Sequence, residues 1–291
     1  MKIAAATYTP EWHADWASLE DKLRRWVHEA AQAGAALLVF PEYAGIEAAL
    51  IGGDLTDDPM LWRDRMSVRE AQWRDLHVGL AQEAGVHILA GSLCAQGPGG
   101  PVNRAWLCGP QDAVAQDKLI PTPYERNFMQ ITGGDGLVLA VTPLGRLGIL
   151  ICYDSEFPLL GRALVEAGAD AILVPSCTDF PAGQTRVRQS CRARAIEGQI
   201  LVVQAPLTGK VQGCTVTDSS VGRAGVFVPP DHGMPPSGIV AQGRKNRAGW
   251  TYATVDPGAV GRIRVQGQVG NAAHWPEQDG KGRLIATLPC N

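Results

Sequence analysis

The stretch LGILICYDSEFP, residues 147–158, carries much of the information about the fold. Its first five residues are small or apolar on both alternating faces, which is typical of a strand buried between two layers. A helical pattern around residues 157–167 follows this strand. Cys152 stands between the two, so the sequence places a thiol where a buried strand gives way to a helix.

The same alternation of apolar strand and amphipathic helix runs along most of the chain. Residues 2–8 predict a strand and residues 16–33 a helix that ends at a glycine. The later predicted strands are residues 35–40, 87–92, 171–174 and 200–204, and the later helices are residues 68–84 and 185–198. Strands that are apolar on both faces and alternate with helices predict an α/β fold in which helices cover the sheets.

Some of the strand pairing is predicted to be antiparallel. Residues 104–107 and 114–116 are joined by the turn-forming sequence CGPQD, residues 108–112. Short extended segments then follow at residues 225–228, 238–241 and 250–255, and the sequence from Pro257 onward is polar and loop-like. Without an internal repeat or a linker, we expect one domain over residues 1–291, with residues 257–291 as a C-terminal tail.

The composition favours a packed protein with a small-molecule partner. Of the 291 residues, 45% are hydrophobic and 19% are charged, which excludes collagen-like and disordered classes. The net charge of -3 gives nucleic acid and anionic membranes no electrostatic reason to bind. The sequence therefore predicts neither a nucleic-acid partner nor a membrane partner.

The cysteines and the N-terminal residues exclude further classes of protein. The seven cysteines contain no C-x-x-C pair and do not cluster with the six histidines, so we expect no disulfide scaffold, no metal site and no cofactor. Residues 1–16 hold too short an apolar run for a signal peptide or a membrane span. The predicted location is the cytoplasm.

Three reactive side chains each follow a predicted strand directly. They are Glu42 in LVFPEY, residues 38–43, Lys118 in QDKLIP, residues 116–121, and Cys152. Together they supply a base for the thiol proton, a cation for a developing oxyanion, and a nucleophile. Taken singly, each has a plain alternative: a surface carboxylate, a solvated strand end and a core thiol.

In their order and local context these residues resemble the nitrilase superfamily of carbon–nitrogen hydrolases. FPE at residues 40–42, DKLIP at residues 117–121 and GILICYDSEFP at residues 148–158 are similar to its glutamate, lysine and cysteine motifs. The resemblance implies a four-layer α-β-β-α sandwich that assembles as a homodimer or a larger even homo-oligomer. Within the superfamily, CYDSEFP, VPSCTD and RARAIE are most similar to the branch often fused to an acetyltransferase domain.

The resemblance also implies a mechanism and a set of site residues. Cys152 would attack the carbonyl carbon, Lys118 and the backbone N–H of Tyr153 would stabilise the oxyanion, and Glu42 would act as base and then as acid. Glu125 would hold Lys118 or orient the amide, although an ion pair with Arg126 is the alternative. Cys177, in VPSCTD, is a further supporting or substrate-binding candidate.

The implied substrate is a small amide. Tyr153 and Asp154 follow the cysteine as in amidase-type members, where true nitrilases commonly carry Trp-Glu. Glu156 stands where several carboxylate-binding members carry arginine, which favours a neutral or cationic acyl group unless Glu156 pairs with Arg192 or Arg194.

A nitrilase acting on a small nitrile and a binding module without turnover remain alternatives. A papain-like enzyme would need His232 or His274, and neither has a recognisable setting. No G-x-S-x-G, H-E-x-x-H or phosphate-loop motif is present.

The helix predicted over residues 185–198 is rich in arginine. Arg186, Arg188, Arg192 and Arg194 lack matching acids nearby in the sequence, and in the resembled family this region forms the dimer interface. We therefore expect this helix to contribute to an interface rather than to bind RNA.

Overall fold

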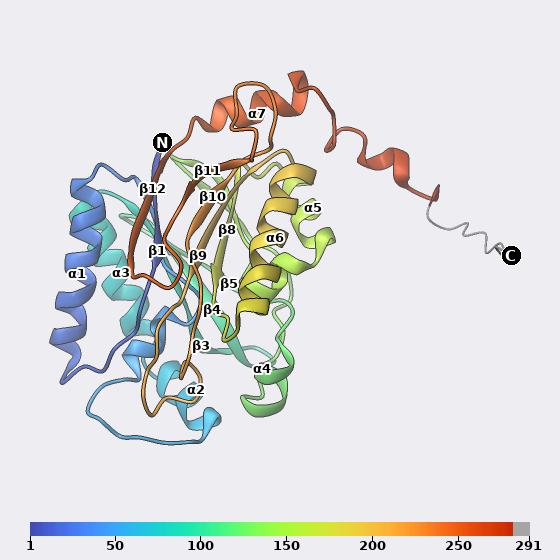
Figure 1. Ribbon diagram of the computed structural model, residues 1–291. Helices are drawn as coiled ribbons and strands as arrows, with labels where there is room; N and C mark the ends of the chain where they lie inside the picture. Colours follow the sequence, from blue (N-terminus) through green and yellow to red (C-terminus); the bar gives the residue numbers. More distant parts are fainter. Residues whose placement is uncertain (282–291) are drawn as a thin grey trace, which may run out of the picture.

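Two six-stranded sheets packed face to face form the centre of the protein. The computed structural model describes residues 1–281, and in it helices cover the outer side of each sheet (Figure 1). The first sheet has the order β12-β1-β2-β3-β4-β5 and the second the order β11-β10-β9-β8-β7-β6. This is the four-layer α-β-β-α sandwich that the resemblance to the nitrilase superfamily implied.

Both sheets mix parallel and antiparallel neighbours, because β1, β2 and β3 are parallel and so are β7, β8 and β9. The strands of the first sheet are β1 (Lys2–Thr7), β2 (Leu37–Val39), β3 (His87–Gly97), β4 (Gly100–Cys108), β5 (Ala113–Asp117) and β12 (Gly249–Thr254). Those of the second are β6 (Leu139–Thr142), β7 (Gly145–Ile149), β8 (Ala171–Ser176), β9 (Leu201–Pro206), β10 (Gly225–Phe227) and β11 (Ile239–Gln242). The predicted antiparallel turn is confirmed, since β4 pairs with β5 in antiparallel register.

The helices fall into two outer layers and several connections. The long ones are α1 (Trp16–Gln32) and α3 (Glu70–Ala84) beside the first sheet, and α5 (Pro158–Glu166) and α6 (Pro181–Glu197) beside the second. The shorter ones are α2 (Pro59–Ser67), α4 (Pro123–Phe128), α7 (Pro257–Gln266) and the 3-10 turns η1 (Ala44–Ala48), η2 (Cys152–Glu156) and η3 (Trp275–Gln278).

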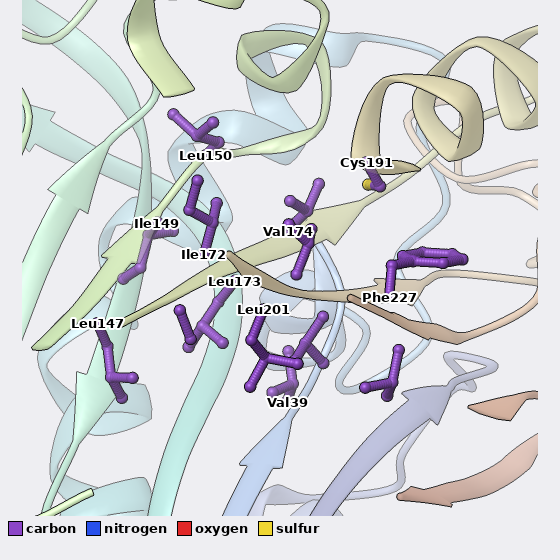
Figure 2. Close-up of a cluster of buried hydrophobic side chains, with 14 of the residues drawn as sticks. Val39, Leu147, Ile149, Leu150, Ile172, Leu173, Val174, Cys191, Leu201 and Phe227 are labelled. Carbon is purple, nitrogen blue, oxygen red and sulfur yellow. The ribbon is translucent and has the colours of Figure 1, made fainter. Parts of the chain in front are cut away.

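Burial on both faces of the strands explains their apolar runs. In β2, Leu37 and Val39 belong to the core between the sheets, whereas Leu38 belongs to the core under α1 and α3. Figure 2 shows the first of these cores, where Val39 lies close to Leu173 and Leu201 of the opposite sheet. The strand ends are thereby fixed rigidly, and Glu42, Lys118 and Cys152 follow β2, β5 and β7.

Two expected helix boundaries differ from the structure. The helix expected over residues 68–84 is α3, which begins two residues later, at Glu70. A separate helix that the sequence did not predict, α2, precedes it, and Asp58 caps α2 by accepting from the N–H of Met60 at 2.8 Å. The helix expected from residue 185 already begins at Pro181, a residue suited to a first helical turn. Among the described residues no helix combines the length and apolar character needed to cross a bilayer.

The loop-like character expected from Pro257 onward is wrong for its first part. Residues 257–266 form α7, which Asp256 caps by accepting from the N–H of Gly258 at 2.9 Å. Val260 and Ile263 of α7 are buried, although glycines at 258 and 261 weaken the helical signal in the sequence. Residues 282–291 of the expected tail lie outside the described part of the chain.

Candidate active site

Cys152 begins the 3-10 turn η2, and two residues separate it from the end of β7 at Ile149. Its φ of 48° lies in the left-handed region, which is costly for a residue with a side chain and occurs mostly where the surrounding structure enforces it. The hydroxyl of Ser155 donates to the carbonyl oxygen of Cys152 at 2.6 Å and closes the turn. The sharp turn fixes the direction in which the thiol leaves the backbone.

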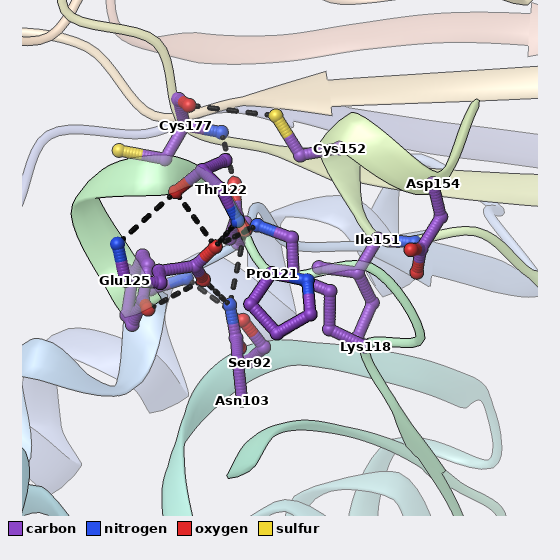
Figure 3. A network of polar contacts seen from close by, with 12 residues as sticks. Ser92, Asn103, Lys118, Pro121, Thr122, Glu125, Ile151, Cys152, Asp154 and Cys177 are labelled. Atoms are coloured by element: carbon purple, nitrogen blue, oxygen red, sulfur yellow. Dashed lines mark hydrogen bonds and ion pairs between the residues drawn. The ribbon is translucent and has the colours of Figure 1, made fainter. Parts of the chain in front are cut away.

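Lys118 lies fully buried between two carboxylates. Its Nζ donates to Glu42 Oε1 at 2.7 Å and to Glu125 Oε2 at 2.7 Å (Figure 3). Burial alone would lower the pKa of Lys118, but the charges of Glu125 and Glu42 outweigh burial and hold the pKa well above its usual value. The lysine therefore stays charged.

The second glutamate is held more tightly than the sequence suggested. The N–H and hydroxyl of Thr122 donate to Glu125 Oε2 at 2.7 and 2.9 Å, which forms a capping box at the start of α4. Arg126 donates instead to the carbonyl oxygen of Pro121 at 2.9 Å, so the alternative ion pair between Glu125 and Arg126 is wrong.

Two further side chains complete this network and were missed in the sequence. Asn103 Nδ2 donates to Glu42 Oε1 at 3.0 Å and to Glu125 Oε1 at 2.9 Å, and the hydroxyl of Tyr43 donates to Glu125 Oε1 at 2.8 Å. Tyr43 could have been suspected because it is adjacent to Glu42. Asn103 gave no such signal, since it is one residue in the middle of β4.

Cys177 contributes through its main chain. Its N–H donates to Glu42 Oε2 at 2.8 Å, and its carbonyl oxygen accepts from Cys152 Sγ at 3.4 Å. Its own sulfur lies 3.6 Å from the hydroxyl of Ser220, away from Cys152 (Figure 3). Residue 177 thus joins the carboxylate and the thiol without using its side chain.

Asp154, in the turn that Cys152 begins, has a structural role that the sequence did not indicate. Its carboxylate accepts from the N–H groups of Leu119, Ile120 and Ile151 at 3.2, 2.9 and 3.2 Å. It ties the loop after Lys118 to the turn that carries Cys152. Burial, only partly offset by these hydrogen bonds, raises the pKa of Asp154 to about 6.

Burial also governs the protons of Glu42 and Cys152. It raises the pKa of Glu42 to about 7, although Lys118 acts in the opposite direction. Burial, followed by the charge of Glu42, raises the pKa of the Cys152 thiol well above its usual value. A raised pKa favours the protonated thiol, which lies beside a carboxylate that can accept its proton.

A pocket of about 610 Å³ opens onto these groups. Its walls include every residue that the sequence predicted for the site: Glu42, Lys118, Glu125, Cys152, Tyr153, Glu156 and Cys177. Glu156 pairs with Arg186 at 3.2 Å rather than with Arg192 or Arg194, and Arg194 pairs with Glu197 at 3.0 Å. Glu156 is thus paired with an arginine, as the alternative expected, but both partners suggested from the sequence, Arg192 and Arg194, are wrong.

One cluster outside the pocket has the residue types of a metal site. Glu11, His13 and Glu47 bring their ligand atoms together, but Lys22 Nζ already lies 2.6 Å from Glu47 Oε1. The hydroxyl of Tyr8 also donates to Glu47. A lysine thus supplies the positive charge, and the cluster, buried except for Glu11, links η1 to α1 through polar contacts.

The family follows from comparison with known proteins. Residues 2–264 match the family model for carbon-nitrogen hydrolases, which includes every strand of both sheets. The chain belongs to the carbon-nitrogen hydrolase family.

Similar proteins agree with this assignment. A probable hydrolase of Bacillus subtilis, YhcX, is 29% identical over 270 residues, which are 92% of this chain but 52% of that protein. A deaminated glutathione amidase of Yersinia enterocolitica is 42% identical over 77 residues, 26% of this chain and 27% of that one. This chain thus spans about half, or less, of the length of these relatives.

Solved structures show the same fold. An amidase from Nesterenkonia sp. AN1, with the acetamide moiety of fluoroacetamide covalently added at its active-site cysteine, superposes with a TM-score of 0.72. The superposition covers 98% of this chain and 97% of that one at 20% identity, so it supports the fold alone.

Proposed function

We propose that this carbon-nitrogen hydrolase is an amidase that cleaves a small amide through a thioester on Cys152. The observation that carries the proposal is the position of Lys118, buried between Glu42 and Glu125 in the pocket that also holds the thiol. A charged lysine with no access to bulk water costs free energy to bury. Such an arrangement is typical of sites that stabilise a developing negative charge.

The proposed first half-reaction releases the amine. Glu42 accepts the thiol proton as the sulfur of Cys152 attacks the carbonyl carbon, and the oxygen of the tetrahedral adduct takes the negative charge. Lys118, with the backbone N–H of Tyr153, stabilises this oxyanion. Glu42 then gives the proton to the nitrogen, the C–N bond breaks, and ammonia or an amine leaves a thioester.

The second half-reaction returns the free thiol. Glu42 takes a proton from water, whose oxygen attacks the thioester carbonyl, and the proton passes to the sulfur as the acid leaves. Glu125 acts as a positioning residue, because it holds Lys118 Nζ while Thr122, Asn103 and Tyr43 fix its own oxygens.

Hydrolysis of a small nitrile is the competing reaction. The assay that separates the two measures ammonia release from matched amides and nitriles that share the same acyl group. We expect faster release from the amides, because Glu42 is placed to protonate a leaving amine and a nitrile adduct has no leaving group until water adds. Faster release from the nitriles would overturn the amide assignment, and no release from any pair would favour a binding module.

The ionisation of Glu42 predicts a pH dependence. Because only ionised Glu42 can accept the thiol proton, and because burial raises its pKa to about 7, kcat/KM should rise roughly tenfold per pH unit below about pH 7 and level off above it. Glu42→Gln should lose activity at every pH. Asp154→Asn should keep the rise near pH 7, and a flat wild-type profile would contradict the role of Glu42 as base.

Assembly, domain extent and location remain proposals. We propose one hydrolase domain over residues 1–291 that forms an even homo-oligomer and resides in the cytoplasm. The argument from unpaired arginines is weaker than expected, because Arg186 and Arg194 of α6 have acidic partners within the chain. Arg188 donates to Gln242 Oε1 at 2.6 Å. Membership of the acetyltransferase-linked branch also remains a prediction.

A further inference from the structure

The walls of the pocket carry more negative than positive charge. Among the described residues its acidic side chains are Glu42, Glu125, Glu156, Asp179 and Asp218, and its basic ones are Lys118 and Arg186. Lys118 is shared by Glu42 and Glu125, and Arg186 is paired with Glu156. Asp179 and Asp218 are left over.

These two aspartates lack a neutralising partner within residues 1–281. Neither carboxylate makes a hydrogen bond or an ion pair there, although Asp179 directly follows Thr178 in the loop after β8 and Asp218 lies between β9 and β10. Partial burial, with the nearby charge of Asp218, raises the pKa of Asp179. Two carboxylates that repel each other across one pocket create a site of negative potential.

Aromatic side chains lie in the same part of the pocket. Tyr124 is 38% exposed and Phe180 is 72% exposed, and both line it. The hydroxyl of Tyr124 donates to the carbonyl oxygen of Thr215 at 3.2 Å, and its pKa is raised by partial burial and then by Asp179 and Asp218. Aromatic rings attract cations, so the rings and the carboxylates favour the same kind of ligand.

Exposure increases from the thiol outward. Glu42, Lys118 and Cys152 are buried, whereas Asp179, Phe180 and Asp218 are exposed. A molecule whose carbonyl carbon reaches Cys152 would therefore leave its far end among the exposed group, which we call the outer wall: Tyr124, Asp179, Phe180 and Asp218.

We infer that the outer wall binds a positively charged group, an ammonium or guanidinium, at the far end of the amide that Cys152 attacks. This specificity rests on the proposed function. An anionic tail would find only Arg186 as a cationic partner there, and Arg186 Nε is already 3.2 Å from Glu156 Oε2. The same tail would be repelled by two unpaired carboxylates. The residues that select the substrate are thus Asp179 and Asp218 rather than Glu156.

The test uses the chemistry of the thiol and does not require turnover. Three methanethiosulfonates with the same two-carbon tail, ending in trimethylammonium, hydroxyl or sulfonate, are reacted with the protein, and modification of Cys152 is followed by mass spectrometry of its peptide. Each rate is divided by the rate of the same reagent with 2-mercaptoethanol. We expect the cationic reagent to be favoured over the anionic one by about tenfold at low salt, at roughly threefold for each of the two exposed carboxylates.

The variants assign this preference to the outer wall. Asp179→Asn with Asp218→Asn should remove most of it, and added salt should reduce it in the wild type. Arg186→Gln should increase it, because Glu156 then loses its partner. Asp21→Asn, an exposed acid on α1, serves as the control and should change nothing.

Two results would overturn the inference: equal normalised rates for the three reagents, or a cationic preference that survives in the double variant. A faster anionic reagent that slows in Arg186→Gln would assign the opposite charge to the substrate. Failure of the proposed function would look different, because the cationic preference would persist while no amide released ammonia.

Discussion

Replacing Cys152 by alanine is expected to reduce amide hydrolysis by at least about 10³-fold, because no other nucleophile reaches the carbonyl carbon once the thiol is gone. Stability should change little. The side chain is small, its φ of 48° is as costly for alanine as for cysteine, and the hydroxyl of Ser155 still closes the turn. Ammonia release and a thermal melt on the same preparations separate the loss of chemistry from a loss of folding.

Two other cysteines serve as matched controls. Cys191 is fully buried on α6 and does not line the pocket, so Cys191→Ala should keep activity. Cys177→Ala should also keep most of it, because residue 177 acts through its N–H and carbonyl groups. If activity remained in Cys152→Ala and disappeared in Cys177→Ala, the nucleophile would be Cys177 and the assignment of Cys152 would be wrong.

Lys118→Met should affect both catalysis and folding. Removing the ammonium leaves Glu42 and Glu125 buried without their shared cation, and breaking a buried ion pair from one side costs about 3–5 kcal/mol. Urea denaturation should show this loss as a lower midpoint. Turnover should fall by at least about 100-fold, since one oxyanion donor is missing.

A second substitution distinguishes the two effects. In Lys118→Met with Glu125→Gln, one of the two unpaired carboxylates is neutral, so part of the lost stability should return. Activity should not return, because the oxyanion still lacks its cation. A Lys118→Met variant as stable as the wild type would contradict the buried ion-pair network, and recovery of activity in the double variant would contradict the role of Lys118.

The strands could be predicted because their signals are local, and the three candidate residues could be selected because each follows a strand and their motifs resemble those of the nitrilase superfamily. Apolar runs at residues 35–40 and 147–151 identify buried strands, and Glu42 and Cys152 follow them directly in the sequence. The helix α7 was missed because its local signal is weak: Gly258 and Gly261 lower its helical propensity. The helix is supported instead by the tertiary burial of Val260 and Ile263.

The remaining parts of the site depend on contacts between distant segments. The main-chain carbonyl oxygen of Asn103 accepts from the N–H of Lys118 at 2.8 Å, which holds Asn103 beside the lysine. Its side-chain amide can therefore donate to both glutamates. The partner of Glu156 is Arg186, although Arg192 and Arg194 were equally good candidates in the sequence. Pairing of this kind is decided by how α6 packs against η2, which no local pattern encodes.

The mass of the protein during turnover tests the central proposal most directly. The wild-type chain is mixed with a small amide, quenched in acid within the first turnovers, and examined intact and as peptides. We predict a mass increase equal to the substrate minus ammonia, located on the Cys152 peptide and absent from Cys152→Ala. An adduct on any other residue, or ammonia release that continues undiminished in Cys152→Ala, would contradict a thioester mechanism at this cysteine.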